Sequence, residues 1–244
     1  MEIKHPLPEQ IPALRQLWKE AFGDTDHFLD QFFGIAFESQ RSLCALIRGE
    51  LAAMAYWFDC GGYAYIYAVA TAKKHRGKGI CHDLMENVHK ILAARGYDGC
   101  ILVPGEDSLR QFYEKMGYEN CGGVREFECT AGVPHLLRKL DRAQYAQARR
   151  QYLPEGGVIQ EGTSLDFLAS WAGFYEGENV LAAAIWEEGK LMILELLGDT
   201  GKAAGVVAAL GAESGWFRTP GQTPFAMHKA LRKNIPPQYF GFCF

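Results

Sequence analysis

Residues 68–81 combine the side chains and the backbone features that a binding site for a phosphate group needs. The segment reads Ala-Val-Ala-Thr-Ala-Lys-Lys-His-Arg-Gly-Lys-Gly-Ile-Cys, so an apolar stretch leads into a turn with four cations and two glycines. A helix is predicted over residues 80–94, because Leu84, Val88 and Leu92 recur at helical spacing. The free N–H groups of a first helical turn and the helix dipole both favour an anion. The pattern therefore predicts a site for a phosphate or diphosphate group.

The spacing of the glycines excludes two familiar phosphate-binding loops. A Walker A loop requires Lys and then Ser or Thr after its second glycine, and here Ile80 and Cys81 follow. A dinucleotide-binding fingerprint requires a third glycine where His82 stands. The pattern that does fit is Q/R-x-x-G-x-G/A. Residues 74–79 match its glycines, and Lys74 stands in the first position in place of Gln or Arg.

A second pattern follows the first along the chain. Residues 98–103 are predicted as a short apolar strand, and residues 107–116 as a helix that carries Tyr113 and is followed by Gly117 and Tyr118. Taken together, the two patterns resemble the GNAT superfamily of acetyl-CoA-dependent N-acetyltransferases. The resemblance implies an α/β (α+β) GNAT fold, with a mixed central sheet flanked by helices.

The resemblance also implies acetyl-CoA as cosubstrate. Its diphosphate is expected on the basic turn. Its pantetheine arm is expected between the strand over residues 63–71 and the strand over residues 98–103, which splay apart. Lys74 departs from the Gln or Arg of the family, but a lysine still donates to phosphate. The residues implied to bind the cosubstrate are Val69, Ala70, Thr71, Lys74, Arg76, Gly77, Lys78, Gly79, Ile80 and Cys81.

For catalysis, the resemblance implies direct attack of an amine on the thioester. An acid must protonate the departing thiolate and a base must accept a proton from the ammonium group. Tyr113 matches the acid of the family. The base is left open between Glu106, which stands where the family often has Asn, and Asp59, with Tyr65 and Tyr67 as residues that could hold a water.

A narrower likeness adds a third candidate for the base. Residues 17–24, Leu-Trp-Lys-Glu-Ala-Phe-Gly-Asp, resemble a tandem-domain branch that includes the enhanced intracellular survival proteins. In that branch the terminal carboxylate reaches the active site. The likeness implies the same role for Phe244, although this chain is shorter than those proteins.

The cysteines do not indicate a nucleophile, a disulfide framework or a zinc site. Neighbouring residues of a helix project about 100° apart, so Cys81 and His82 cannot form a Cys-His dyad. The seven cysteines are odd in number and widely spread, without a C-x-x-C pair. They are predicted to be reduced thiols, mostly buried.

Two domains are predicted from the 244 residues, because domains commonly run to about 100–150 residues. We expect an acetyl-CoA-binding GNAT domain over residues 1–130 and a degenerate GNAT-like domain over residues 131–244. In the second half, residues 178–198 repeat the hairpin pattern of the first, but residues 200–206 offer one cation where the first half offers four. The alternative is that two α/β halves rich in Ala and Leu simply look alike.

The remaining elements follow from apolar periodicity and from turn residues. A helix is expected over residues 8–22, and a second helix begins at Thr25 as N-cap. A further helix is expected just beyond Pro220-Gly221, and the C-terminal residues 238–244 are expected to form an apolar strand. The other predicted elements are strands at residues 43–48, 51–58 and 63–71, a pair of strands at 118–121 and 124–129, and a helix over 136–150.

The overall charge and the N-terminus limit the partners. A net charge of −4 argues against nucleic acid, since the cations gather at one turn and not along a face. The first residues contain no apolar h-region, and no apolar run is long enough to span a bilayer, so a cytoplasmic protein without membrane contact is expected. The sequence leaves the oligomeric state open, a homo-oligomer included.

Two functions of different class fit the sequence. The first is transfer of an acetyl group from acetyl-CoA to a primary amine of a small molecule or peptide. Acidic residues on the first two helices, Asp24, Asp26, Asp30 and Glu38, could recognise a cationic amine or could be ordinary surface charges. The alternative function is a non-catalytic acyl-CoA-binding or regulatory module, and the sequence does not fix the size of the acyl group.

Overall fold

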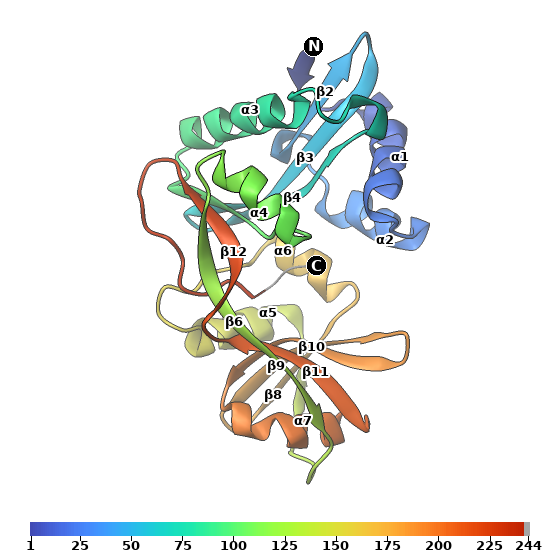
Figure 1. The fold of residues 1–244 in the computed structure, drawn as a ribbon. Helices are drawn as coiled ribbons and strands as arrows, with labels where there is room; N and C mark the ends of the chain where they lie inside the picture. Colours follow the sequence, from blue (N-terminus) through green and yellow to red (C-terminus); the bar gives the residue numbers. More distant parts are fainter. Residues whose placement is uncertain (242–244) are drawn as a thin grey trace. The chain divides into compact units, whose positions relative to one another are not determined.

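The computed structural model describes residues 1–241 and divides into two compact units (Figure 1). Unit 1 comprises residues 1–119 and 228–235, and unit 2 comprises residues 120–227 and the chain from Pro236 on. Strand β12 (Thr223–Ala230) contributes its first residues to unit 2 and its last residues to unit 1. The expected boundary after residue 130 stays a prediction; the compact units divide at residue 120, and residues 228–235 return to unit 1.

Unit 1 is built on a mixed sheet. The strands follow one another in the order β1, β2, β3, β4, β5 and the end of β12. The pairs from β1 to β4 are antiparallel, and β4 and β5 are parallel because α3 connects them. The bounds are Glu2–Lys4 for β1, Ser42–Ile47 for β2, Glu50–Cys60 for β3, Tyr63–Thr71 for β4 and Gly99–Leu102 for β5.

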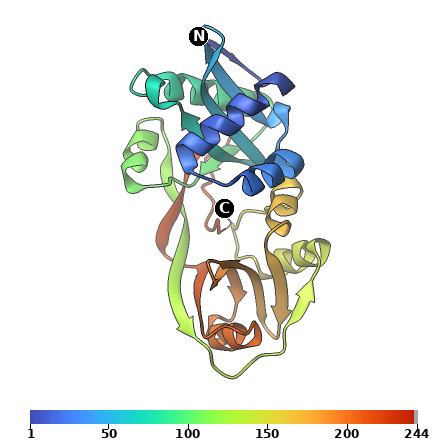
Figure 2. The same ribbon diagram turned by 90° about the vertical axis from the view of Figure 1, so that its right-hand side faces the viewer.

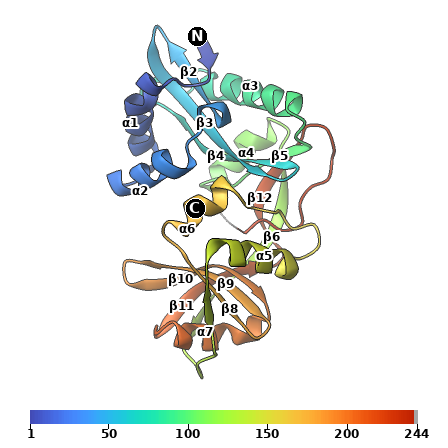
Figure 3. The same ribbon diagram turned by 180° about the vertical axis from the view of Figure 1, so that it is seen from behind.

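Helices cover both faces of this sheet, with α1 on one face and α3 on the other (Figures 1 and 3). The prediction of a helix over residues 80–94 is confirmed, because α3 spans Ile80–Ala94 and buries Leu84, Val88 and Leu92. The N-cap at Thr25 is confirmed as well, since its hydroxyl accepts a hydrogen bond from the backbone N of Phe28. The other helices are α1 (Ile11–Phe22), α2 (Asp26–Gln31), the π-helical turn η2 (Phe32–Ala36), α4 (Asp107–Glu114) and the 3-10 turns η1 (Pro8–Gln10), η3 (Ser39–Arg41) and η4 (Lys73–His75).

Helix α1 lies across the sheet (Figure 2), and an aromatic cluster fixes α1 and the following turns there. The indole of Trp18 is buried, with its ring centroid 4.5 Å from that of Phe32, 5.4 Å from that of Tyr56 and 5.7 Å from that of Tyr67. Such tilted and edge-on contacts add to the apolar area that these large rings bury.

Unit 2 repeats the connectivity of unit 1. Strands β8, β9 and β10 form an antiparallel run, and helix α7 then leads into β11, which is parallel to β10. One apolar core lies against α5 and α6, and a second lies against α7. The strand order is β12, β6 (Glu119–Thr130), β11 (Ser214–Pro220), β10 (Lys190–Gly198), β9 (Val180–Glu187), β8 (Gly173–Gly177) and β7 (Arg138–Leu140); the helices are α5 (Arg142–Tyr152), α6 (Thr163–Ala169), the 3-10 turn η5 (Thr200–Lys202) and α7 (Ala203–Ala209).

The prediction of two strands around residues 118–129 was wrong, because β6 is one continuous strand through Gly122 and Gly123. The two glycines do not turn the chain back. Their backbone N–H groups donate to the carbonyls of Pro237 and Gln238, and a Cβ on Gly123 would lie 2.3 Å from the carbonyl oxygen of Gly221. The glycines therefore permit close packing of three segments.

Two helices were also predicted wrongly. The residues expected to begin a helix at 136 include strand β7, and α5 begins only at Arg142, where Asp141 and Gln144 form a capping box. Beyond Pro220-Gly221 the chain forms β12 and not a helix. The backbone N–H of Gly221 donates to the carbonyl of Gly123, and β6 lies between β11 and β12 in the strand order.

The described residues have two further properties that bear on function. Six cysteines lie in residues 1–241 as free thiols; three of them, Cys44, Cys60 and Cys100, are buried as predicted, and the other three are half-buried. Within the same residues, no helix combines the length and the apolar composition that a membrane span requires.

Candidate functional site

The edge of β4 opens towards β5 in unit 1. The parallel register runs from Tyr63 opposite Gly99 to Tyr65 opposite Ile101 and ends there, although β4 continues to Thr71. A β-bulge lies in this stretch, where Ala68 has a φ of 50°. The backbone N–H and C=O groups of β4 beyond Tyr65 are therefore placed to pair with an extended ligand, as with an added strand.

The glycine-containing turn that follows β4 leaves the N-terminus of α3 accessible. Gly77 and Gly79 have φ values of 73° and 77°, which favour glycine, and no atom lies within 4 Å of where a Cβ would stand on either residue. Gly79 is the N-cap of α3, and no side chain caps this helix end. The first N–H groups of α3 are free of a side-chain acceptor and can bind an anion.

The cations of the turn fold back over it. The Lys74 ammonium pairs with the carboxylate of Glu50, the Arg76 guanidinium donates through Nε to the carbonyl of Thr71 at 3.0 Å, and the Lys78 ammonium donates to the carbonyl of Lys74 at 2.9 Å. Arg76 and Lys78 thus bring positive charge to the glycines, while Glu50 offsets the charge of Lys74. The sequence alone did not reveal this local neutralisation.

Tyr113 lies on α4 and is buried, with 7% of its surface exposed. Burial raises the pKa of its hydroxyl, so the group keeps its proton at neutral pH. Its ring packs edge-on against the ring of Tyr118 at a centroid distance of 5.5 Å. A protonated phenol held in this way is chemically suited to donate a proton.

Cys81 is half-buried in the first turn of α3. Burial raises the pKa of its thiol to about 11, so it remains a thiol at neutral pH. The neighbouring His82 is turned to solvent, with Nδ1 3.7 Å from the carboxylate of Asp83. These features agree with the argument from helix geometry that Cys81 and His82 form no nucleophilic pair.

The three candidates for the base have different settings. Glu106 is exposed at the N-cap of α4, seven residues before Tyr113, which corresponds to about 10 Å along a helix axis. Asp59 is exposed near the end of β3. Phe244 lies outside the described residues. The described geometry brings neither Glu106 nor Asp59 into hydrogen-bonding contact with Tyr113, and the assignment of the base stays a prediction.

The acidic side chains of the first two helices are compensated locally. The Asp26 carboxylate lies 2.5 Å from the ammonium of Lys19, and the Asp30 carboxylate lies 2.6 Å from the guanidinium of Arg15. The hydrogen bond from Lys19 lowers the pKa of Asp26. These pairs support the reading of both acids as surface charges within a network.

In unit 2 the parallel register of β10 and β11 likewise ends early, at Ile193 opposite Phe217, but side chains of the protein bond to the backbone beyond it. A bulge interrupts β10 between Ile193 and Glu195, and the hydroxyl of Thr219 on β11 donates to the carbonyl of Leu196 at 2.8 Å. The turn before α7 is also occupied, because the carboxylate of Asp199 accepts a hydrogen bond from the backbone N–H of Gly201 at 2.9 Å. A side chain of the protein thus uses a donor that an anion would need.

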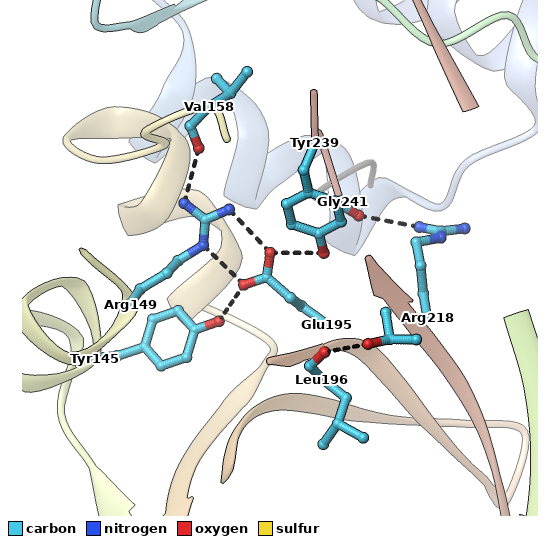
Figure 4. Close-up of polar contacts among 9 residues, drawn as sticks. Tyr145, Arg149, Val158, Glu195, Leu196, Arg218, Tyr239 and Gly241 are labelled. Carbon is cyan, nitrogen blue, oxygen red and sulfur yellow. Dashed lines mark hydrogen bonds and ion pairs between the residues drawn. The ribbon is translucent and has the colours of Figure 1, made fainter. Parts of the chain in front are cut away.

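A buried ion pair lies beside this bulge (Figure 4). Glu195 accepts two hydrogen bonds from Arg149, at 2.8 and 2.9 Å, and one each from the hydroxyls of Tyr145 and Tyr239, at 2.9 and 3.0 Å. Burial lowers the pKa of Arg149, but the Glu195 carboxylate raises it further, so the guanidinium stays charged. Sequence analysis missed this cluster, although a lone glutamate within the apolar run Leu-Met-Ile-Leu-Glu-Leu-Leu was a usable signal.

Comparison with known families matches residues 2–121 to the acetyltransferase (GNAT) domain. This range includes β4, the glycine-containing turn, α3 and α4 with Tyr113. No curated protein matches the sequence of this chain.

Solved structures share the fold over nearly the whole chain. A GCN5-related N-acetyltransferase from Kribbella flavida has a TM-score of 0.73 at 18% identity, over 95% of this chain and 71% of that chain. Eis1 from Mycobacterium abscessus has a TM-score of 0.68 at 12% identity, over 95% and 74%. A GCN5-related N-acetyltransferase from Sphaerobacter thermophilus has a TM-score of 0.60 at 15% identity, over 98% of each chain. At these identities the likeness concerns the fold.

Proposed function

Because residues 2–121 make this chain a member of the GNAT acetyltransferase family, we propose that it transfers an acetyl group from acetyl-CoA to a primary amine of a small molecule or peptide. Acetyl-CoA is the acyl donor of this family. The observation that carries the proposal is the uncapped N-terminus of α3 at Gly79, directly after the open edge of β4.

The described residues suit acetyl-CoA in two places. The diphosphate would accept hydrogen bonds from the N–H groups at the start of α3, with Arg76 and Lys78 supplying charge. The pantetheine arm would pair with the backbone of Val69 and Thr71, where β5 no longer accompanies β4.

The transfer needs no covalent intermediate on the protein. The lone pair of the neutral amine attacks the thioester carbonyl, a C–N bond forms, and the C–S bond breaks with its electron pair on sulfur. The amine nitrogen loses one proton to a base, and Tyr113 donates a proton to the departing thiolate. Burial raises the pKa of Tyr113, so the phenol carries a proton when the thiolate leaves.

The base is proposed among the same three groups as before. Glu106 is the candidate within the acetyltransferase domain that stands on the same helix as the acid. Asp59 and the carboxylate of Phe244 are the alternatives. A side chain at the exposed N-cap of α4 can accept a proton and pass it to solvent.

A panel of primary amines tests the proposal, with free CoA thiol measured after addition of acetyl-CoA. At least one amine should give turnover in the wild-type protein. The Tyr113→Phe variant should lose about 100-fold in kcat while its Kd for CoA stays within about twofold. Tyr63→Phe is the matched control, because it also removes a tyrosine hydroxyl bond in unit 1, to the carbonyl of Ile235, and should keep full activity. Binding of CoA without thiol release from any amine would favour the non-catalytic module instead.

A further inference from the structure

A buried polar cluster lies directly behind Tyr113 in unit 1, on α3, β5 and the turn after α4. Its centre is Tyr118, whose hydroxyl oxygen lies 2.8 Å from Nε2 of His89 and 3.2 Å from Sγ of Cys100. All three side chains are less than 5% exposed. Two polar groups from two other segments therefore meet at one phenol in an apolar core.

Two contacts connect Tyr118 to Tyr113. The rings pack edge-on with centroids 5.5 Å apart, and the backbone N–H of Tyr118 donates to the carbonyl of Tyr113 at 3.1 Å. The second contact belongs to the turn that ends α4, in which Gly117 has a φ of 84°. A displacement of the Tyr118 ring would therefore reach Tyr113 through its side chain and through its backbone.

The far side of the cluster reaches the surface through Glu86. Its carboxylate oxygen lies 3.4 Å from Nδ1 of His89, and its side chain is 40% exposed. A carboxylate on this side favours the tautomer with the proton on Nδ1, which leaves Nε2 to accept from the hydroxyl of Tyr118. With its proton given to Nε2, the hydroxyl can accept from the thiol of Cys100.

We propose that Tyr118, held by His89 and Cys100, is a positioning residue that fixes the phenol of Tyr113 for proton transfer to the departing thiolate. The inference rests on the function proposed above. Proton transfer depends on a well-defined donor position. The hydroxyl of Tyr118 contributes to that position, because it ties the ring that packs against Tyr113 to α3 and β5.

The test is a double-mutant cycle on kcat. Tyr118→Phe keeps the ring and removes the hydroxyl, and it should lower kcat about tenfold with the KM for acetyl-CoA within about twofold. In the Tyr113→Phe background, the same substitution should cause no further loss, because no proton donor is left to position. Equal losses in both backgrounds would overturn the proposal, as would an unchanged kcat in Tyr118→Phe.

A pair of variants at His89 keeps the test decisive if Tyr118→Phe fails to fold. His89→Gln retains a polar partner for the hydroxyl and should recover part of kcat, whereas His89→Leu should match Tyr118→Phe. Equal kcat values for the two would overturn the proposal. Tyr63→Phe again serves as the control for loss of a hydroxyl bond in unit 1. Absence of turnover in the wild-type protein would refute the proposed function. This result is distinct from the outcome of the double-mutant cycle, which compares kcat values among active proteins.

Discussion

The two turns that follow the bulged strands of units 1 and 2 share a connectivity but differ in what their backbone donors bind. After β4, Gly79 caps α3 without a side chain, and the nearby N–H groups are free for a ligand. After β10, the carboxylate of Asp199 accepts from the backbone of Gly201, and Thr219 spans to the carbonyl of Leu196. No side chain caps the helix after the first turn, whereas a side chain of the protein accepts from the second turn.

The bulges show the same contrast. In unit 1 the bulge at Ala68 lies beyond the last residue of β4 that pairs with β5. In unit 2 Glu195 follows the bulge and binds Arg149, Tyr145 and Tyr239 in a buried network. The comparison teaches that a repeated topology can carry a structural ion pair beside the bulge of one copy and none of those groups in the other.

Removal of one partner from the ion pair should give the largest effect. Arg149→Met leaves the Glu195 carboxylate buried without its cation, and we expect a loss of about 3–5 kcal/mol in the free energy of unfolding. Urea denaturation measures this. The matched variant Lys74→Met breaks the exposed pair with Glu50 in unit 1 and should cost less than about 1 kcal/mol. Similar losses from the two variants would contradict the contrast.

A carboxylate placed at the first turn should make it resemble the second. Gly79→Asp puts an acceptor and a negative charge at the N-cap of α3, and the Kd for CoA should rise by at least about 100-fold in calorimetry. Gly189→Asp controls for backbone strain, because Gly189 has a similar φ of 80° in a turn of unit 2. The Kd of this control variant for CoA should stay at the wild-type value. An unchanged Kd for CoA in Gly79→Asp would contradict the placement of the anion site at the N-terminus of α3.

The pH dependence of stability should separate the buried groups of the two units. Burial lowers the pKa of His89 to about 4, whereas an unfolded histidine titrates near 6.5. As the pH falls below about 6.5, His89 binds a proton in the unfolded chain but not in the folded one. The free energy of unfolding therefore falls until about pH 4. We expect a loss of about 2 kcal/mol between pH 7 and pH 5 from this residue.

The control for this slope is His89→Leu, which should flatten it in denaturation curves recorded at several pH values. Arg149 contributes no slope in this range, because its raised pKa keeps it charged throughout. If the pH dependence of stability is unchanged in His89→Leu, other groups cause it. His228 is then the first candidate, because burial lowers its pKa as well.

Most elements of unit 1 could be predicted because their signals are local. The apolar spacing of Leu84, Val88 and Leu92 requires a helix, and α3 has the predicted bounds. The failures lie where distant segments meet. Gly122 and Gly123 carry a turn signal, but Pro237 and Gln238 accept from their N–H groups and keep β6 extended. No local pattern contains that information.

In the candidate site too, the local features could be predicted and the long-range contacts could not. The glycine positions and the cations of the turn were visible in the sequence, because a short segment carries them all. The pairing of Lys74 with Glu50, and the cluster of Tyr118 with His89 and Cys100, join residues from different elements. Their contacts depend on how α3, α4 and β5 pack.

The sequence by itself determined the basic turn, the helix that it caps and the tyrosine of α4, since backbone conformation and helical periodicity are properties of neighbouring residues. The tertiary structure decided which polar groups surround the two bulged strands. In unit 2, Thr219 bonds to the carbonyl of Leu196, and Arg149 and Tyr239 reach Glu195 across the fold of the unit. Such contacts arise between residues far apart in the chain, and only the packing of the core brings them together.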